Sequence, residues 1–151
     1  MNRVLVVGGG LAGVEAAWAL ANRGVPVTIA EMKPKKHSPA HKTDMLAELV
    51  CSNSLKAQRV GSAAGLLKAE MERLGSICVE CAKKCSVPAG GALAVDRDEF
   101  SRMITEKIKS HPLIELECRE VTDIPEGNVI IAAGPLASDA LAEKIKELCG
   151  G

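Results

Sequence analysis

The sequence predicts an α/β fold in which a Rossmann-like parallel sheet carries helices on both faces. The apolar run Val4–Val7 is followed directly by a glycine-rich turn and a helix-like stretch, and residues 26–30 form a second apolar run. Strand-like and helix-like segments then alternate along the chain, which favours parallel pairing. With 151 residues, 47% of them hydrophobic, we expect one domain over residues 1–151 with a substantial core.

The glycine-rich turn has the pattern G-x-G-x-x-G, formed by Gly8, Gly10 and Gly13 with Leu11 and Ala12 between the last two. The first glycine permits a tight turn, the second lets the backbone approach a phosphate, and the third lets the helix pack closely on the sheet. The N-terminus of the helix would then face the anion. An ordinary structural turn is the alternative interpretation.

An acidic residue strengthens the dinucleotide interpretation. Glu31 follows the second apolar run and lies 18 residues after Gly13. An acid at this point can hold the hydroxyl groups of a ribose. Strand, glycines, helix, strand and acid in this order predict a nucleotide-binding site.

The middle of the chain begins with a polar loop over residues 33–44, which we expect on the surface, in contact either with solvent or with a phosphate-bearing ligand. An amphipathic helix is predicted over residues 63–74, ending at Gly75. Ala92–Val95 is expected to be a short strand. Asp96 is the expected N-cap of a helix that continues to His111.

The last third should contain strands at Ile114–Cys118, at residues 121–124 and, buried, at residues 128–133. Ser138 should cap a final helix that runs to Leu148. Ligands bind at the carboxyl ends of parallel strands, so Gly134 is a second candidate for close approach to a cofactor, with an ordinary turn glycine as the alternative.

Composition excludes several classes of function. The 19 basic and 19 acidic residues cancel, so we expect no strong independent binding of nucleic acid by this chain. The aromatic residues are Trp18 and Phe100, too few for a base-stacking platform. No apolar run is long enough to cross a bilayer, so we expect no membrane association and a cytoplasmic protein with reduced thiols.

Three cysteines form the pattern C-x-x-C-x-x-x-C: Cys78, Cys81 and Cys85. A metal site and a redox-active dithiol are two interpretations. Metal sites usually need four ligands, and no residue of the sequence is singled out as the fourth. We therefore predict no metal and favour ordinary thiols, either packed or exposed.

Three further stretches, residues 39–44, 48–55 and 87–97, resemble the folate- and flavin-dependent tRNA (uracil-5-)-methyltransferases, a family also known as glucose-inhibited division proteins. The likeness runs from Val4 to about Glu147. Enzymes of that family are several-fold longer, so the resemblance implies an incomplete, N-terminal piece. The fold it implies is an FAD-binding domain of the glutathione-reductase type.

The resemblance implies that the glycine motif and Glu31 bind FAD. The reduced flavin would pass a one-carbon unit from methylenetetrahydrofolate to carbon 5 of a uridine in tRNA, and NADH or NADPH would supply the electrons. Activity of this chain by itself is left open. Alternatives are a paralogue acting on ribosomal RNA, a general FAD or NAD(P) oxidoreductase, and a non-catalytic nucleotide-binding module.

Cys51 is the candidate catalytic residue in the family motif. A thiolate could add to carbon 6 of uridine or remove the proton from carbon 5. Residue type alone favours a buried, inert thiol instead. Ser52 and Asn53 could bind the flavin edge or folate, or simply form a turn. Gly90 and Gly91 could let the backbone pass close to the flavin ring.

Overall fold

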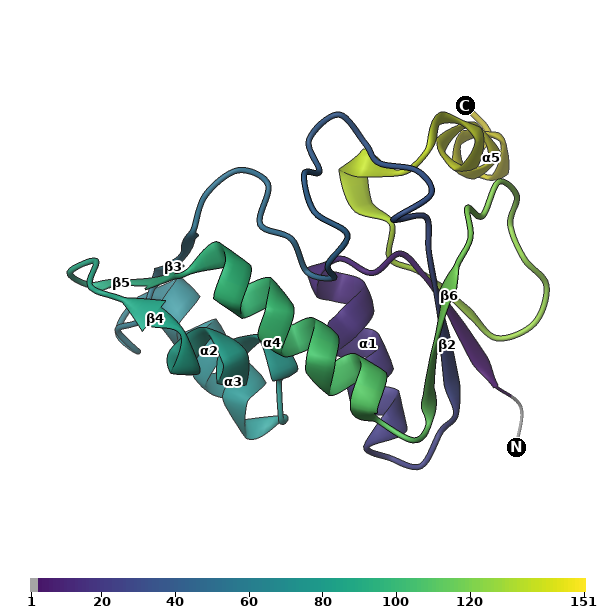
Figure 1. The fold of residues 1–151 in the computed structure, drawn as a ribbon. Helices are drawn as coiled ribbons and strands as arrows, with labels where there is room; N and C mark the ends of the chain where they lie inside the picture. The colour runs from purple at the N-terminus through teal and green to yellow at the C-terminus, as the bar shows by residue number, and fades with distance from the viewer. Residues whose placement is uncertain (1–2) are drawn as a thin grey trace.

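The computed structural model describes residues 3–151, and its main element is a four-stranded parallel sheet (Figure 1). The strands are β1 (Val4–Val7), β2 (Val27–Glu31), β6 (Ile114–Cys118) and β7 (Val129–Ile131). They lie in the order β6-β2-β1-β7, with Val7 beside Ala30 of β2 and Ile131 of β7. The predicted parallel α/β fold is confirmed, with β2 beginning and ending one residue later than expected.

Helices cover both faces of this sheet. On one face α1 (Leu11–Ala21) packs on β1 and β2, α4 (Arg97–Ser110) packs on β6, and the core between them includes Val6, Val27 and Ile29. On the other face α5 (Asp139–Leu148) buries Leu141 against Val7 and Ala30. Neighbouring residues of a strand point to opposite faces, so β1 contributes Val6 to one core and Val7 to the other. Figure 1 shows the two helical layers on either side of the strands.

A second unit is inserted between β2 and α4. It holds a three-stranded antiparallel sheet of β3 (Ser54–Ala57), β5 (Ala92–Val95) and β4 (Ser86–Val87), with helices α2 (Ala63–Arg73) and α3 (Ile77–Lys84). Helix α3 contacts α1 and α4, so the two units share one core. Of these elements, β5 and α2 were predicted, and α2 ends one residue early with Leu74 as its C-cap.

Two expectations for the last third were wrong. Residues 121–124 form no strand. The Asp123 carboxylate accepts from the N–H of Ile124, which competes with strand pairing, and Val121 packs in the core beneath α5. Strand β7 is shorter than predicted and is not buried. Among residues 3–151 it pairs only with β1, at the edge of the sheet, and Ile130 and Ile131 are 37% and 38% exposed.

Among the described residues, 3–151, no helix is long and apolar enough to cross a membrane.

The third glycine of the motif sets the distance between α1 and the strand that precedes it. A Cβ added at Gly13 would lie 1.9 Å from the carbonyl oxygen of Gly8, whereas one added at Gly10 meets nothing within 4 Å. Backbone atoms cannot move aside as a flexible side chain can. A Cβ added at Gly13 would therefore push α1 away from the turn.

We therefore expect Gly13→Ala to lower the free energy of unfolding by about 1–3 kcal/mol, even though alanine favours helix more than glycine does. Gly10→Ala is the matched control and should change the free energy of unfolding little. Urea denaturation followed by circular dichroism measures both. Equal midpoints for Gly13→Ala and the unaltered chain would contradict the close packing described.

Candidate dinucleotide-binding site

The turn after β1 has the geometry that the glycine motif requires. Gly8 adopts φ +102°, and its N–H donates to the carbonyl oxygen of Ala30 at 2.9 Å. A Cβ at Gly8 would lie 2.9 Å from the carbonyl oxygen of Ala132, just past β7. Only glycine fits a left-handed residue wedged between two strand ends.

Gly9, the next residue, is hydrogen-bonded through both its N–H and its carbonyl oxygen. The N–H of Gly9 donates to Oε2 of Glu31 at 2.7 Å, and its carbonyl oxygen accepts from the N–H of Ala47 at 2.9 Å. A Cβ here would meet Leu46 at 2.5 Å and the Glu31 carboxylate at 2.9 Å. Gly9 occupies a free position of the motif, so pattern matching could not identify this constraint.

The N-terminus of α1 is the part of the turn left open to a ligand. Helices α2, α3, α4 and α5 each begin with a Ser or Asp side chain that accepts from a backbone N–H, whereas α1 begins at Gly10 with no side-chain cap. The first N–H groups of a helix have no partner within it. Those at Leu11 and Ala12 border a cavity and attract an anion, with the helix dipole adding to the attraction.

Glu31 ends β2 at the floor of this cavity, with only 8% of its surface exposed. Its Oε2 accepts from Gly9 and its Oε1 accepts from the N–H of Lys33 at 3.0 Å. Each carboxylate oxygen has a second lone pair. The carboxylate is therefore held rigidly and still has acceptor capacity for two ligand hydroxyls.

The cavity encloses about 320 Å³ at the carboxyl ends of the parallel strands. Of the residues predicted to bind a cofactor it is lined by Gly8, Gly10, Leu11, Ala12, Glu31 and Gly134. Gly13 packs behind the turn instead. Further lining residues follow β6 and β7 and were not singled out as ligand-binding from the sequence: Arg119, Glu120, Val121, and residues 132–138 apart from Gly134. Their position after strand ends was the signal that could have identified them.

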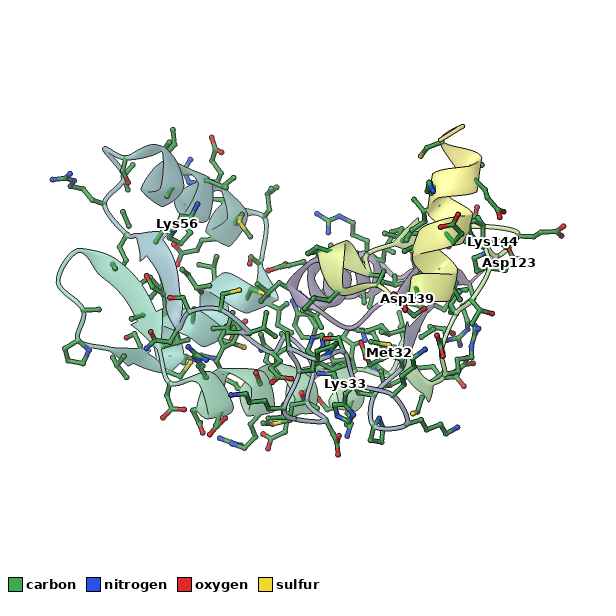
Figure 2. The ribbon with its side chains drawn as sticks, turned by 90° about the horizontal axis from the view of Figure 1, so that it is seen from above. Met32, Lys33, Lys56, Asp123, Asp139 and Lys144 are labelled. Carbon is green, nitrogen blue, oxygen red and sulfur yellow. The ribbon has the colours of Figure 1, made fainter. Side chains whose placement is uncertain are left out.

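One wall of the cavity is the polar segment after β2. Lys33 was expected on the surface, but it is 5% exposed and its Nζ donates to the Met45 carbonyl at 2.5 Å. Figure 2 shows Lys33 and Met32 in the middle of the molecule, between the unit that carries Lys56 and helix α5 with Asp139 and Lys144. Lys33 is buried because Glu48 lies 3.4 Å from its Nζ and balances the charge.

Glu48 organises the same wall. Burial raises its pKa, but the N–H groups of Lys42 and Thr43 and the ammonium of Lys33 outweigh burial and hold the pKa below its ordinary value. The N–H of Lys42 donates to Oε1 at 2.8 Å. The carboxylate thus closes residues 42–48 into a hydrogen-bonded loop, and Glu48 itself lines the cavity.

Two further lysines of the loop, Lys35 and Lys36, also have partners within the protein. Nζ of Lys35 donates to the carbonyl of Cys118 at 3.1 Å, and Nζ of Lys36 lies 2.7 Å from the Glu120 carboxylate. These contacts attach the loop to the end of β6. The positive charge of Lys36 is partly neutralised by Glu120.

The remaining predicted site residues lie outside the cavity lining. Cys51 is exposed, which corrects the expectation from residue type, and follows Val50, which does line the cavity. Oγ of Ser52 accepts from the N–H of Ser54, and Nδ2 of Asn53 donates to the Val95 carbonyl at 3.2 Å. Gly90 and Gly91 form the exposed turn between β4 and β5, with open space around both.

Of the three-cysteine pattern, Cys78 and Cys81 lie on the buried face of α3, and Cys85 is its buried C-cap. Burial raises the pKa of Cys81 to about 11 and raises that of Cys78 further, helped by the nearby Glu15 carboxylate. Sγ of Cys85 lies 3.0 Å from the Cys81 carbonyl. Within residues 3–151 no group of three or more His, Cys, Asp or Glu could hold a metal ion. These thiols pack in the core.

Comparison with known proteins identifies relatives over almost the whole chain. The family model "Glucose inhibited division protein A" matches residues 3–148. The chain is 60% identical over 149 residues to "Methylenetetrahydrofolate--tRNA-(uracil-5-)-methyltransferase TrmFO" of Enterococcus faecalis, and 63% identical over 150 residues to the Aquifex aeolicus protein of that name. Each alignment covers 99% of this chain and 34% of the relative. The chain thus spans about a third of the length of these curated relatives.

Solved structures show the same fold at low sequence identity. GidA of Aquifex aeolicus, in its form I crystal, superposes with a TM-score of 0.73 at 15% identity, covering 96% of this chain and 30% of that one. CtdE in complex with FAD and a substrate superposes with a TM-score of 0.50 at 14% identity, covering 84% of this chain and 32% of that one.

We expect Glu31→Gln to weaken binding of an adenine dinucleotide by about ten- to a hundredfold, because the charged acceptor of two hydroxyl groups is lost. Glu143→Gln, on the exposed side of α5, is the matched control. Isothermal titration of both variants measures the change. Equal affinity in Glu31→Gln would show that the carboxylate only supports the turn.

We expect Cys51 and Cys149 to react quickly with iodoacetamide near pH 8, and Cys78, Cys81 and Cys85 to react only after unfolding, because thiolate is the reactive form and burial suppresses it. The folded pKa of Cys81 is raised from 9.0 to about 11. Burial of the neutral Cys81 thiol therefore stabilises the fold in full below pH 9, and this stabilisation is lost as the pH rises toward 11. Mass spectrometry of alkylated peptides assigns each thiol, and fast labelling of the α3 cysteines would contradict this description.

Proposed function

The chain belongs to the glucose inhibited division protein A family, and from this we propose that it is the FAD-binding part of an enzyme that methylates carbon 5 of a uridine in tRNA. The supporting observation is the uncapped N-terminus of α1 facing a cavity with a rigidly held acid on its floor. That combination suits the diphosphate and the ribose of a dinucleotide.

The residues present fit the adenosine diphosphate half of FAD. Donors at Leu11 and Ala12 would bind the diphosphate, and Glu31 would bind the ribose hydroxyls. The cavity, at about 320 Å³, lies at the lower end of the range for small-molecule sites. We infer that the residues of this cavity would hold the nucleotide half of FAD.

The names of the relatives define the rest of the proposal. A methylene group carried by folate is two electrons more oxidised than the methyl group of the product, so the reaction needs a reductant. Bound FAD would supply that redox chemistry and carry the one-carbon unit, with NADH or NADPH as the electron source. Such a reaction takes place where tRNA and reduced nicotinamide are present, which we propose is the cytoplasm.

Cys51 is the proposed catalytic residue of this chain. Uridine carbon 5 becomes a better nucleophile when a thiolate adds to carbon 6, and a thiolate could alternatively take the proton from carbon 5. Exposure of Cys51 beside the cavity-lining Val50 supports either role, because a polynucleotide substrate must reach the group from solvent. Direct contacts of Ser52, Asn53, Gly90 and Gly91 to flavin or folate stay predictions.

A chimera tests the proposal. This chain would replace the matching third of the Aquifex aeolicus relative, and we expect the chimera to purify with flavin absorbance and to methylate unmodified tRNA with methylenetetrahydrofolate and a reduced nicotinamide. Cys51→Ala should abolish methyl transfer and leave the flavin bound, while Cys149→Ala, the second exposed thiol, should leave both unchanged.

Four outcomes would contradict the proposal or a part of it. Methylation of ribosomal RNA instead of tRNA would assign the chain to a paralogue. Oxidation of reduced nicotinamide without any methyl transfer would indicate a general oxidoreductase. Absence of flavin would leave a nucleotide-binding module, and full turnover of Cys51→Ala would remove this thiol from the mechanism.

We expect the chain alone to bind tRNA weakly. Its 19 basic and 19 acidic residues cancel, and Lys33, Lys35 and Lys36 already have partners within the protein. Fluorescence anisotropy with labelled tRNA at several salt concentrations measures this. A tight complex that weakens steeply with salt would contradict it.

A further inference from the structure

His41 lines the cavity, and one of its ring nitrogens is already engaged. Oγ of Ser38 lies 2.7 Å from Nδ1, and the N–H of Ala40 points to the same Oγ at 3.3 Å. Among residues 3–151, Nε2 has no hydrogen-bond partner, so it is the nitrogen left for a ligand.

The contacts of Ser38 favour one tautomer of His41. A backbone N–H can only donate, so Oγ of Ser38 accepts from Ala40. The hydroxyl hydrogen of Ser38 then has Nδ1 of His41 within reach as an acceptor, at 2.7 Å between the heavy atoms. When Nδ1 accepts this hydrogen, a neutral imidazole carries its proton on Nε2.

The surroundings keep the ring neutral. Burial and the ammonium of Lys33 lower the pKa of His41, with a smaller contribution from His37, and the carboxylates of Glu48 and Glu31 only partly oppose them. A second cation beside the buried Lys33 would be costly, whereas a neutral N–H donor is not.

We propose that His41 binds the dinucleotide as a neutral donor, its Nε2–H directed to a diphosphate oxygen of the adenosine diphosphate half. This inference rests on the proposed function only in taking a dinucleotide as the occupant of the cavity. Two lining carboxylates near His41, those of Glu31 and Glu48, are acceptors and cannot bind phosphate oxygens. His41 supplies a side-chain donor for those oxygens, in addition to the N–H groups of α1.

The first test observes the tautomer directly. Long-range ¹H–¹⁵N spectra of the histidines near pH 8 should show His41 with its proton on Nε2, and Ser38→Ala should weaken that preference. A proton on Nδ1 in the unaltered protein would overturn the proposal. This measurement needs no ligand and no activity.

The second test compares ADP with adenosine, both titrated calorimetrically. We expect His41→Ala to weaken ADP binding about tenfold and adenosine binding little. His41→Gln, whose amide can place an N–H near the position of Nε2, should restore most of the affinity, whereas His41→Asn should not. His37→Gln, in the same loop and outside the cavity lining, is the control.

The outcomes separate the two proposals. If the unaltered chain binds ADP and His41→Ala binds it equally well, only the role of His41 is overturned. If the unaltered chain binds neither ADP nor FAD, the proposed function is overturned and this inference with it. Circular dichroism of each variant shows that a loss of affinity does not reflect loss of the fold.

Discussion

The pair of hydrogen bonds that the Glu31 carboxylate accepts is the constraint on which the rest of the site depends. One oxygen holds the N–H of Gly9 in the glycine turn, and the other holds the N–H of Lys33 at the start of the next loop. Charge-assisted bonds of this kind are stronger than neutral ones and lose little to solvent when buried. The end of β2, the glycine turn and the polar loop are thus oriented by a single side chain.

The loop after β2 depends on this anchor and extends it. Lys33 and Glu48 form an ion pair whose side chains are 3% and 11% exposed, and Glu48 in turn holds the N–H groups of Lys42 and Thr43. The N–H of Ala47 then returns to the carbonyl of Gly9. A buried pair of this kind adds little net stability, but removal of either partner leaves an uncompensated charge, so it favours one loop conformation over others.

The inserted unit is joined to the parallel sheet and its helices by a polar contact that no local pattern indicates. Glu15 of α1 accepts from the hydroxyl of Ser76 and from the N–H of Cys78, so α1 provides part of the cap of α3. The eight residues of α3 place Ile77, Cys78 and Cys81 in the shared core. In the sequence these cysteines suggested ligand chemistry, because spacing alone does not distinguish a metal site from the buried face of a short helix.

The sequence by itself determined the parallel sheet, the glycine turn and the acid at the end of β2, because these follow from local rules: apolar runs of strand length, a residue that tolerates φ +102°, and a fixed separation along one βαβ unit. Tertiary structure alone decided that Lys33 is buried, that Cys51 is exposed, that β7 is an edge strand, and that residues 119–121 join the cavity. The burial of Lys33 and the edge position of β7 depend on partners more than ten residues away. Burial and strand order are properties of the packed chain, whereas turn geometry and strand period are properties of neighbouring residues.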